Sequence, residues 1–254
     1  MQRLDDKLKN SLKELIFGFI SFDKEPKFLE RIADLIAKLY SKSALNEIFG
    51  FIVGWMANES PNARRFGIYM IEVLCDLGAI NDDVVQNTTN EFLNIFNKGL
   101  EDSDIQVKIS CLKATTQFIS NLTQQNIVMK FSSLTGPIID TLVYALKNDL
   151  EKGKLALQSI NNLSEAYPKL WKDKLELLVE VCCQILQEKS FDEGVKEPTL
   201  QIILTMAGKT PAFMRKSDNF NKSFLPILFS MMLDVNCPDD VEEWNKLVII
   251  KYIL

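Results

Sequence analysis

Asp104-Ile-Gln-Val-Lys-Ile-Ser-Cys111 and Asp192-Glu-Gly-Val-Lys-Glu-Pro-Thr199 are two copies of one pattern. Each copy starts with an aspartate, a residue type that caps helix N-termini, and continues with valine, lysine and a small residue at the fourth, fifth and eighth positions. The valine and the small residue share one side of an α-helix, because residues four positions apart lie on the same face. Each copy therefore predicts the start of an amphipathic helix.

The same kind of helix start recurs along the chain. Asp23 and Ser60 can also act as N-caps, and each stands four residues before a basic residue, whereas Lys154 opens a fifth helix with a weaker cap. Successive starts are separated by 37, 44, 46 and 42 positions, counted between the basic residues Lys27, Arg64, Lys108, Lys154 and Lys196. A period near forty residues is typical of a repeated unit of two helices, as in HEAT repeats.

Apolar residues follow helical spacing throughout the chain, and the alternation expected of β-strands is absent. The predicted helix after Asp104 carries two apolar rows, one of Val107, Cys111, Ala114, Phe118 and Leu122 and one of Ile105, Ile109, Leu112 and Ile119. A helix that is apolar on two sides must be covered from two sides, as happens inside a stack of helical hairpins. The sequence therefore predicts an all-α fold, an α-α superhelix (solenoid) of about five to six HEAT-like helical hairpins.

We call the first helix of each hairpin A and the second helix B. Hairpins are expected near residues 5–40, 43–77, 82–122, 124–166 and 169–208, with a last one from residue 223 onward. The fourth A helix is expected to break at Gly136-Pro137, since proline interrupts a helix interior. We expect the solenoid to fill residues 1–245, and we interpret the apolar stretch 246–254 as an atypical tail or an artefact of the reading frame.

Each B helix also has a polar row opposite its packed side. Side by side, these rows would form one wide surface, which we predict to be the concave face and the site of partner binding. A solvated face without a binding role is the alternative for any single residue. The candidate residues are Arg65, Tyr69, Glu72, Asp76, Gln117, Gln158, Asn161, Glu165, Glu197 and Gln201, with Gln106, Ser110, Lys113, Lys154 and Glu193 in the same rows.

The composition argues against several kinds of function. A formal charge of −5 disfavours binding to nucleic acid or to an anionic membrane, since both need a clustered positive field. The chain contains no histidine, and its five cysteines lack metal-ligand spacing. We therefore expect no catalytic centre, no metal, no cofactor, no direct contact with nucleic acid and no membrane association.

The acid, valine, lysine and small residue of the opening pattern resemble the signature of HEAT-repeat B helices. In HEAT proteins the acid and the basic residue commonly link successive repeats in a ladder. This resemblance implies that Asp104, Lys108, Asp192 and Lys196 are repeat-stacking residues.

The second half of the chain resembles the N-terminal arch of importin-beta (karyopherin-beta) receptors, specifically the importin beta-3 branch. The similar stretches are Glu197 to Lys216, with its Met-Arg-Lys turn, Phe224 to Asp234, with its Leu-Phe-Ser-Met-Met-Leu-Asp helix, and Asp239 to Trp244. Arg31 to Lys38 and Gly54 to Ser60 fit the earlier repeats of that family. Because these receptors are several times longer, the chain is expected to be a fragment.

The resemblance implies a nuclear import receptor that shuttles between cytoplasm and nucleus. Its expected partners are the GTPase Ran in its GTP form, cargo proteins with basic localisation signals, and Phe-Gly nucleoporins. The acidic run Asp239, Asp240, Glu242, Glu243 and Trp244 resembles a partner-binding loop of the family, and its four carboxylates would attract a lysine-rich partner.

Two other interpretations rest on the same helical pattern. One is a different HEAT scaffold, such as a phosphatase regulatory subunit, a vesicle-coat protein or a chromosome-organising protein. The other is the helical region of a large enzyme, although the chain has no P-loop, glycine-rich loop or kinase motif.

Overall fold

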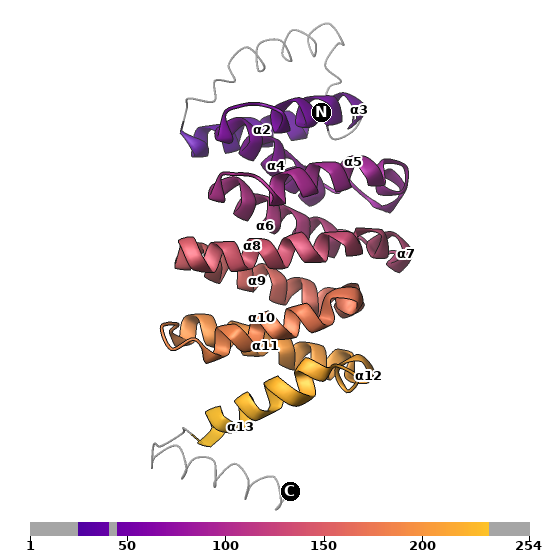
Figure 1. Cartoon of the computed structure of the whole chain (residues 1–254). Helices are drawn as coiled ribbons and strands as arrows, with labels where there is room; N and C mark the ends of the chain where they lie inside the picture. Colours follow the sequence, from indigo (N-terminus) through magenta and orange to yellow (C-terminus); the bar gives the residue numbers. More distant parts are fainter. Residues whose placement is uncertain (1–24, 41–44, 234–254) are drawn as a thin grey trace, which may run out of the picture.

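The computed structural model describes residues 25–40 and 45–233, and within them every regular element is helical. The helices lie one above another from the N-terminal to the C-terminal end, in two layers (Figure 1). The predicted all-α solenoid is confirmed.

One layer holds the A helices and the other the B helices. The A helices are α3 (Leu45–Met56), α5 (Asp82–Leu100), α8 (Thr135–Asn148), α10 (Leu175–Gln187) and α13 (Leu225–Leu233). The B helices are α2 (Pro26–Tyr40), α4 (Pro61–Asp76), α6 (Ile105–Asn121), α9 (Leu150–Ala166) and α11 (Glu193–Lys209). Short segments connect each B helix to the next A helix: α7 (Gln125–Val128), the 3-10 helices η1 (Met129–Leu134) and η2 (Pro168–Lys174), α12 (Pro211–Met214) and the π-helical turn η3 (Phe220–Phe224).

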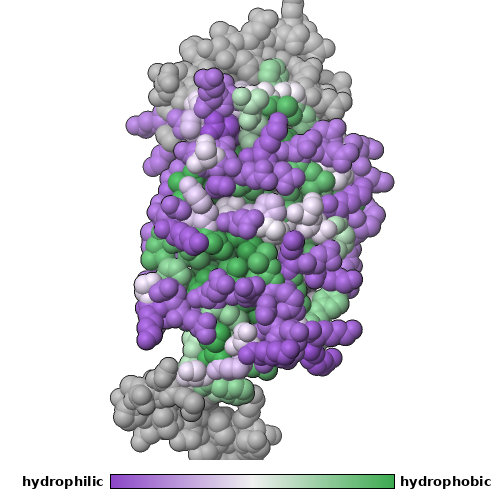
Figure 2. Space-filling model, in the orientation of Figure 1, coloured by the Kyte–Doolittle hydropathy of each residue, from purple (hydrophilic) through white to green (hydrophobic). Residues whose placement is uncertain are grey.

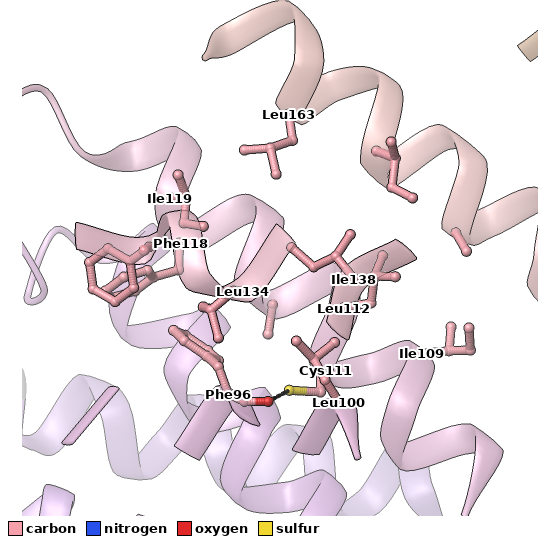
Figure 3. Close-up of a cluster of buried hydrophobic side chains, with 14 of the residues drawn as sticks. Phe96, Leu100, Ile109, Cys111, Leu112, Phe118, Ile119, Leu134, Ile138 and Leu163 are labelled. Carbon is pink, nitrogen blue, oxygen red and sulfur yellow. Dashed lines mark hydrogen bonds between the residues drawn. The ribbon is translucent and has the colours of Figure 1, made fainter. Parts of the chain in front are cut away.

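The B helices α4, α6 and α9 each pack against the A helix of their own hairpin and against the B helices before and after them. Thus α6 contacts α5, α4 and α9, which explains why its sequence is apolar on more than one side. Figure 3 shows the result: Phe118 of α6 lies close to Phe96 of α5 and Leu134 of η1. The core therefore runs along the whole stack and does not close into a globule.

Small residues set the distance between neighbouring helices. A Cβ atom on Gly99 of α5 would lie 2.4 Å from the Sγ atom of Cys111 in α6. The Cys111 thiol donates to the Phe96 carbonyl at 3.5 Å, the dashed line of Figure 3. A Cβ atom on Gly153 of α9 would lie 2.5 Å from Cδ2 of Leu146.

The predicted helix starts are largely confirmed. The Asp104 carboxylate accepts hydrogen bonds from the backbone N–H groups of Gln106 and Val107, at 2.8 and 3.1 Å, and so caps α6. Asp192 stands at the N-cap position of α11, but its side chain does not cap that helix. Asp23 lies outside the described residues.

The expected break at Gly136-Pro137 is wrong. Both residues lie in the first turn of α8, where proline removes no helical hydrogen bond. The irregular segment comes earlier, in η1, where Phe131 and Leu134 are fully buried. The first predicted A helix and the segment after Leu233 lie outside the described residues.

Candidate protein-binding surface

The polar rows of α4 and α6 lie side by side, and hydrogen bonds join them. The Lys113 ammonium lies 2.9 Å from the Glu72 carboxylate, and the Gln117 amide donates to Asp76 at 2.6 Å. Both pairs are 41 positions apart in sequence, which is one repeat. The structure therefore brings these predicted residues together on one face, which we call the B-helix face.

A groove of about 270 Å³ opens on this face between α2, α4 and α6. Arg65, Tyr69, Glu72 and Lys113 line it with Glu30 of α2. Its apolar lining comes from Leu29, Phe66, Ile109 and Leu155. The Arg65 Nε–H is buried and has no hydrogen-bond partner among the described residues, so a partner that supplies an acceptor would satisfy it.

Glu72 is the buried member of the row, since only 7% of the residue is exposed. Burial raises the pKa of its carboxyl above the usual value, and the Lys113 ammonium opposes this only in part. Burial and the carboxylates of Asp34 and Glu30 also raise the pKa of Tyr69, to about 12. The phenol therefore stays a hydrogen-bond donor at neutral pH, and it lies 3.5 Å from Asp34.

The row continues over α9 and α11. Gln158, Glu197 and Gln201 are exposed, and Asn161 is half-buried with its carbonyl oxygen unbonded among the described residues. Lys209 of α11 joins α9 by donating to the Glu165 carbonyl at 2.6 Å.

The predicted stacking residues have different surroundings. Asp192 lies 3.3 Å from Lys154 of the preceding repeat. Asp104 caps its own helix, and Lys108 donates to the Leu100 carbonyl at 2.8 Å while lying over the Tyr144 ring of the next repeat. Lys196 is half-buried in the second turn of α11. The ladder role stays a prediction for all four residues.

The sequence interpretation missed the most buried ion pair between repeats in the described part of the chain. Arg64 of α4 binds Asp102 through two parallel hydrogen bonds of 2.6 and 2.9 Å, and the two side chains are 14% and 7% exposed. Arg64 and Asp102 are 38 positions apart, as are Lys154 and Asp192. This shared separation of base and acid was the signal available in the sequence.

The A helices present a different, apolar surface. Figure 2 shows a hydrophobic area at the level of α8 and α10 on the face that the A helices form. Among the residues of these two helices, Tyr144 and Leu177 are 39% and 36% exposed, and α8 and α10 pack against each other. Scattered apolar residues are ordinary on surfaces, but a contiguous area on adjacent helices suits an apolar ligand.

The described residues offer little for catalysis. They contain no group of three or more residues able to hold a metal ion. Cys75 and Cys111 are buried, and burial raises the pKa of each thiol to about 12, which makes them poor nucleophiles. None of the described helices has the length and hydrophobicity needed to cross a bilayer.

Comparison with known proteins identifies the family. A family model described as "IPO5-like, TPR repeats" matches residues 24–181, and one described as "Importin repeat" matches residues 188–248. The chain belongs to the importin-beta family. This membership favours the importin interpretation over the phosphatase, coat and chromosome scaffolds.

Two importins from distant organisms are similar in sequence. Importin subunit beta-3 of Saccharomyces cerevisiae is 22% identical over 91% of the chain, and a probable importin-5 homologue of Dictyostelium discoideum is 23% identical over 86%. The chain spans about a fifth of the length of these relatives, 21% and 20%.

Solved importin-beta family structures share the fold. Kap121p bound to Nup53p matches 95% of the chain and 23% of its own length, with a TM-score of 0.77 and 19% identity. Kap121p bound to RanGTP matches with a TM-score of 0.74 and 18% identity. The acidic run Asp239 to Trp244 lies outside the described residues, although the importin-repeat match includes it.

Proposed function

We propose that the chain is part of a nuclear import receptor and binds basic proteins and Ran-GTP through its B-helix face. The supporting observation is an excess of acid along the polar rows that hydrogen bonds link. On α4, α6, α9 and α11 these rows hold five carboxylates and three cations, namely Glu72, Asp76, Glu165, Glu193 and Glu197 against Arg65, Lys113 and Lys154. Lys154 is already paired with Asp192 and Glu151.

An excess of acid on the B-helix face suits the recognition of basic localisation signals. A surface with one sign of charge speeds the encounter with an oppositely charged partner and favours it over neutral competitors. The groove beside Arg65 and Tyr69 adds apolar contact area between these charges. The acidic run from Asp239 to Glu243 would attract the same kind of basic partner.

The apolar area on α8 and α10 is proposed to bind Phe-Gly nucleoporins. Exposed Tyr144 and Leu177 offer the contact area that a phenylalanine ring requires, on the layer opposite the acidic face. Cargo and pore proteins would then occupy different layers, as a receptor that shuttles between cytoplasm and nucleus needs.

The decisive test compares binding of the chain to Ran loaded with GTP and with GDP. Retention of Ran-GTP alone supports the proposal, and equal retention of both forms contradicts it. A lysine-rich peptide tests the acidic face. Changing Asp34, Asp76, Glu165 and Glu197 to their amides should weaken this peptide roughly tenfold and flatten its salt dependence.

A matched control removes the same number of charges elsewhere. Asp83, Glu91, Asp140 and Glu180 are exposed on the A helices, and their amide variants should bind the lysine-rich peptide as the unchanged chain does. An equal loss in both variants would mean that net charge, and not the B-helix face, attracts the peptide.

A further inference from the structure

The hairpins are connected at two opposite edges of the stack. At the A-to-B edge an A helix ends and its B helix begins; at the B-to-A edge a B helix ends and the next A helix begins, as at α7 and α12 (Figure 1). The A-to-B connections are residues 57–60, 101–104, 149 and 188–192, and the B-to-A connections are residues 77–81, 122–134, 167–174 and 210–224.

These two edges carry opposite charge. The A-to-B connections contain seven acids and one base, namely Glu59, Glu101, Asp102, Asp104, Asp149, Glu188 and Asp192 against Lys189. The B-to-A connections contain seven bases and two acids, namely Lys130, Lys169, Lys172, Lys174, Arg215, Lys216 and Lys222 against Asp173 and Asp218. The B-to-A connections thus carry a net charge of +5, whereas the whole chain has a net charge of −5.

Folding accounts for much of the acidic edge. Asp104 and Asp149 cap the B helices that follow them. Asp102 binds Arg64, and Asp192 binds Lys154. These carboxylates therefore stabilise the hairpins and need no ligand to explain them.

Folding does not account for the basic edge in the same way. Lys222 pairs with Asp218 at 2.9 Å, but the other six cations form no ion pair within residues 25–40 and 45–233, and all six are exposed. Helix dipoles give no reason for them either. Each connection joins the negative end of a B helix to the positive end of an A helix, so the two dipoles oppose each other there.

The segments that carry the six cations, η1, η2 and α12–η3, follow one another along the B-to-A edge of the stack. η1 packs on η2, and the Lys174 side chain lies 3.6 Å from the Cβ position of Gly136 in the first turn of α8. η3 packs on α10, where the backbone N–H groups of Asp218 and Asn219 donate to the Glu176 carboxylate at 3.2 and 3.0 Å. These bonds engage the nearest acid of α10. Figure 2 shows hydrophilic surface along this border of the stack.

We propose that this basic strip over η1, η2 and α12–η3 binds an extended acidic segment of a partner protein. Neighbouring packed helices lie about 10 Å apart, and an extended chain rises about 3.3 Å per residue. An acid at every third position would therefore meet one connection after another. The strip lies at the edge of the stack and is separate from the proposed cargo and Ran face.

A polypeptide suits the strip better than a nucleic acid does. Duplex DNA carries a charge about every 1.7 Å of its axis, far denser than cations on successive repeats. Single strands bind by stacking on exposed aromatic rings, whereas the rings of these connections, such as Tyr167, Trp171 and Phe220, are buried or half-buried.

The test measures fluorescence anisotropy of a labelled serine-glycine peptide of about 15 residues with glutamate at every third position, against the full chain. Changing Lys169, Lys172, Lys174 and Lys216 to glutamate should weaken binding roughly tenfold. The control variant changes four exposed lysines away from the strip, Lys27, Lys98, Lys147 and Lys189, with the same change in net charge. It should bind within about twofold of the unchanged chain.

Three results would overturn the proposal: an equal loss in both variants, unchanged binding by the strip variant, or tighter binding of a single-stranded RNA of equal charge. If the strip variant does not reach the unchanged chain's melting temperature, glutamine replaces glutamate at the same four positions. This milder variant removes four charges without reversing them, so it should weaken binding of the peptide about threefold, half of the tenfold effect on a free-energy scale.

Discussion

Arg64 joins two repeats through one side chain. Besides its two bonds to Asp102, its Nη1 atom donates to the carbonyls of Asn58 and Glu59, at 2.9 and 2.8 Å. The guanidinium therefore binds the A-to-B connections of two successive repeats, residues 57–60 and 101–104. The planar fork of arginine makes this possible, and a lysine could not reproduce the paired bonds.

Glu72 gives a residue-scale prediction about pH. Its pKa is raised in the folded protein, so the folded state resists ionisation that the unfolded chain allows. The free energy of unfolding of the wild type is therefore highest below the pKa that Glu72 has in the unfolded chain. It decreases as the pH rises from that value to the raised pKa of the folded state. Glu72→Gln removes this effect, so its stability relative to wild type should rise as the pH increases above the usual glutamate pKa of about 4.

Chemical denaturation at several pH values measures this difference. Glu197→Gln, an exposed carboxylate on the same face, is the control, and its difference from wild type should not rise in this way. A constant or falling difference for Glu72→Gln would contradict the assigned effect of burial.

Helical spacing was enough to place Glu72 in a polar row. Its burial depends on α2 and α6, which local sequence does not reveal.

At the scale of elements, the contact between α5 and α6 depends on glycine. A Cβ on Gly99 would lie 2.4 Å from Sγ and 2.9 Å from Cβ of Cys111, and this Cβ cannot move unless the backbone of α6 moves. Gly99→Ala should therefore push the helices apart and destabilise the protein by about 1–3 kcal/mol. Gly54→Ala, with no described atom within 4 Å, should instead stabilise by about 0.5–1 kcal/mol. Thermal unfolding of both variants measures the contrast, and a stabilised Gly99→Ala would show that the helices can separate freely.

Helix starts could be predicted from sequence where a local interaction produces them. Asp104 caps its helix as expected, because the cap involves residues only two and three positions away. The break assigned to Gly136-Pro137 was wrong because the irregular segment forms where Phe131 and Leu134 enter the core. That is a long-range effect, since the Phe131 ring lies 5.3 Å from Phe118 of α6.

For the whole molecule, the repeat period was enough to predict a stack and its polar face. The partners of individual side chains were not predictable, because they come from the next repeat, about forty residues away. Arg64 was predicted to mark the start of a repeat, but Asp102 was not predicted to be its ion-pair partner. The basic edge was also missed, since its lysines are scattered in sequence and gather only when the connections stack.

In a solenoid each repeat contacts only the repeats before and after it. A destabilising substitution should therefore loosen its own repeat and those two neighbours. Phe118 lies within 5.3 Å of the rings of Phe92, Phe96 and Phe131, near the middle of the stack. Phe118→Ala should cost about 3–5 kcal/mol and raise amide hydrogen exchange from α4 to α9. Phe224→Ala, equally buried near the C-terminal end, should raise exchange from α10 to α13 and leave α4 to α6 protected. Hydrogen exchange followed by mass spectrometry distinguishes the two patterns. A uniform rise over all helices in both variants would mean that the chain unfolds as one globule, and the stacked-repeat account of its binding faces would lose its physical basis.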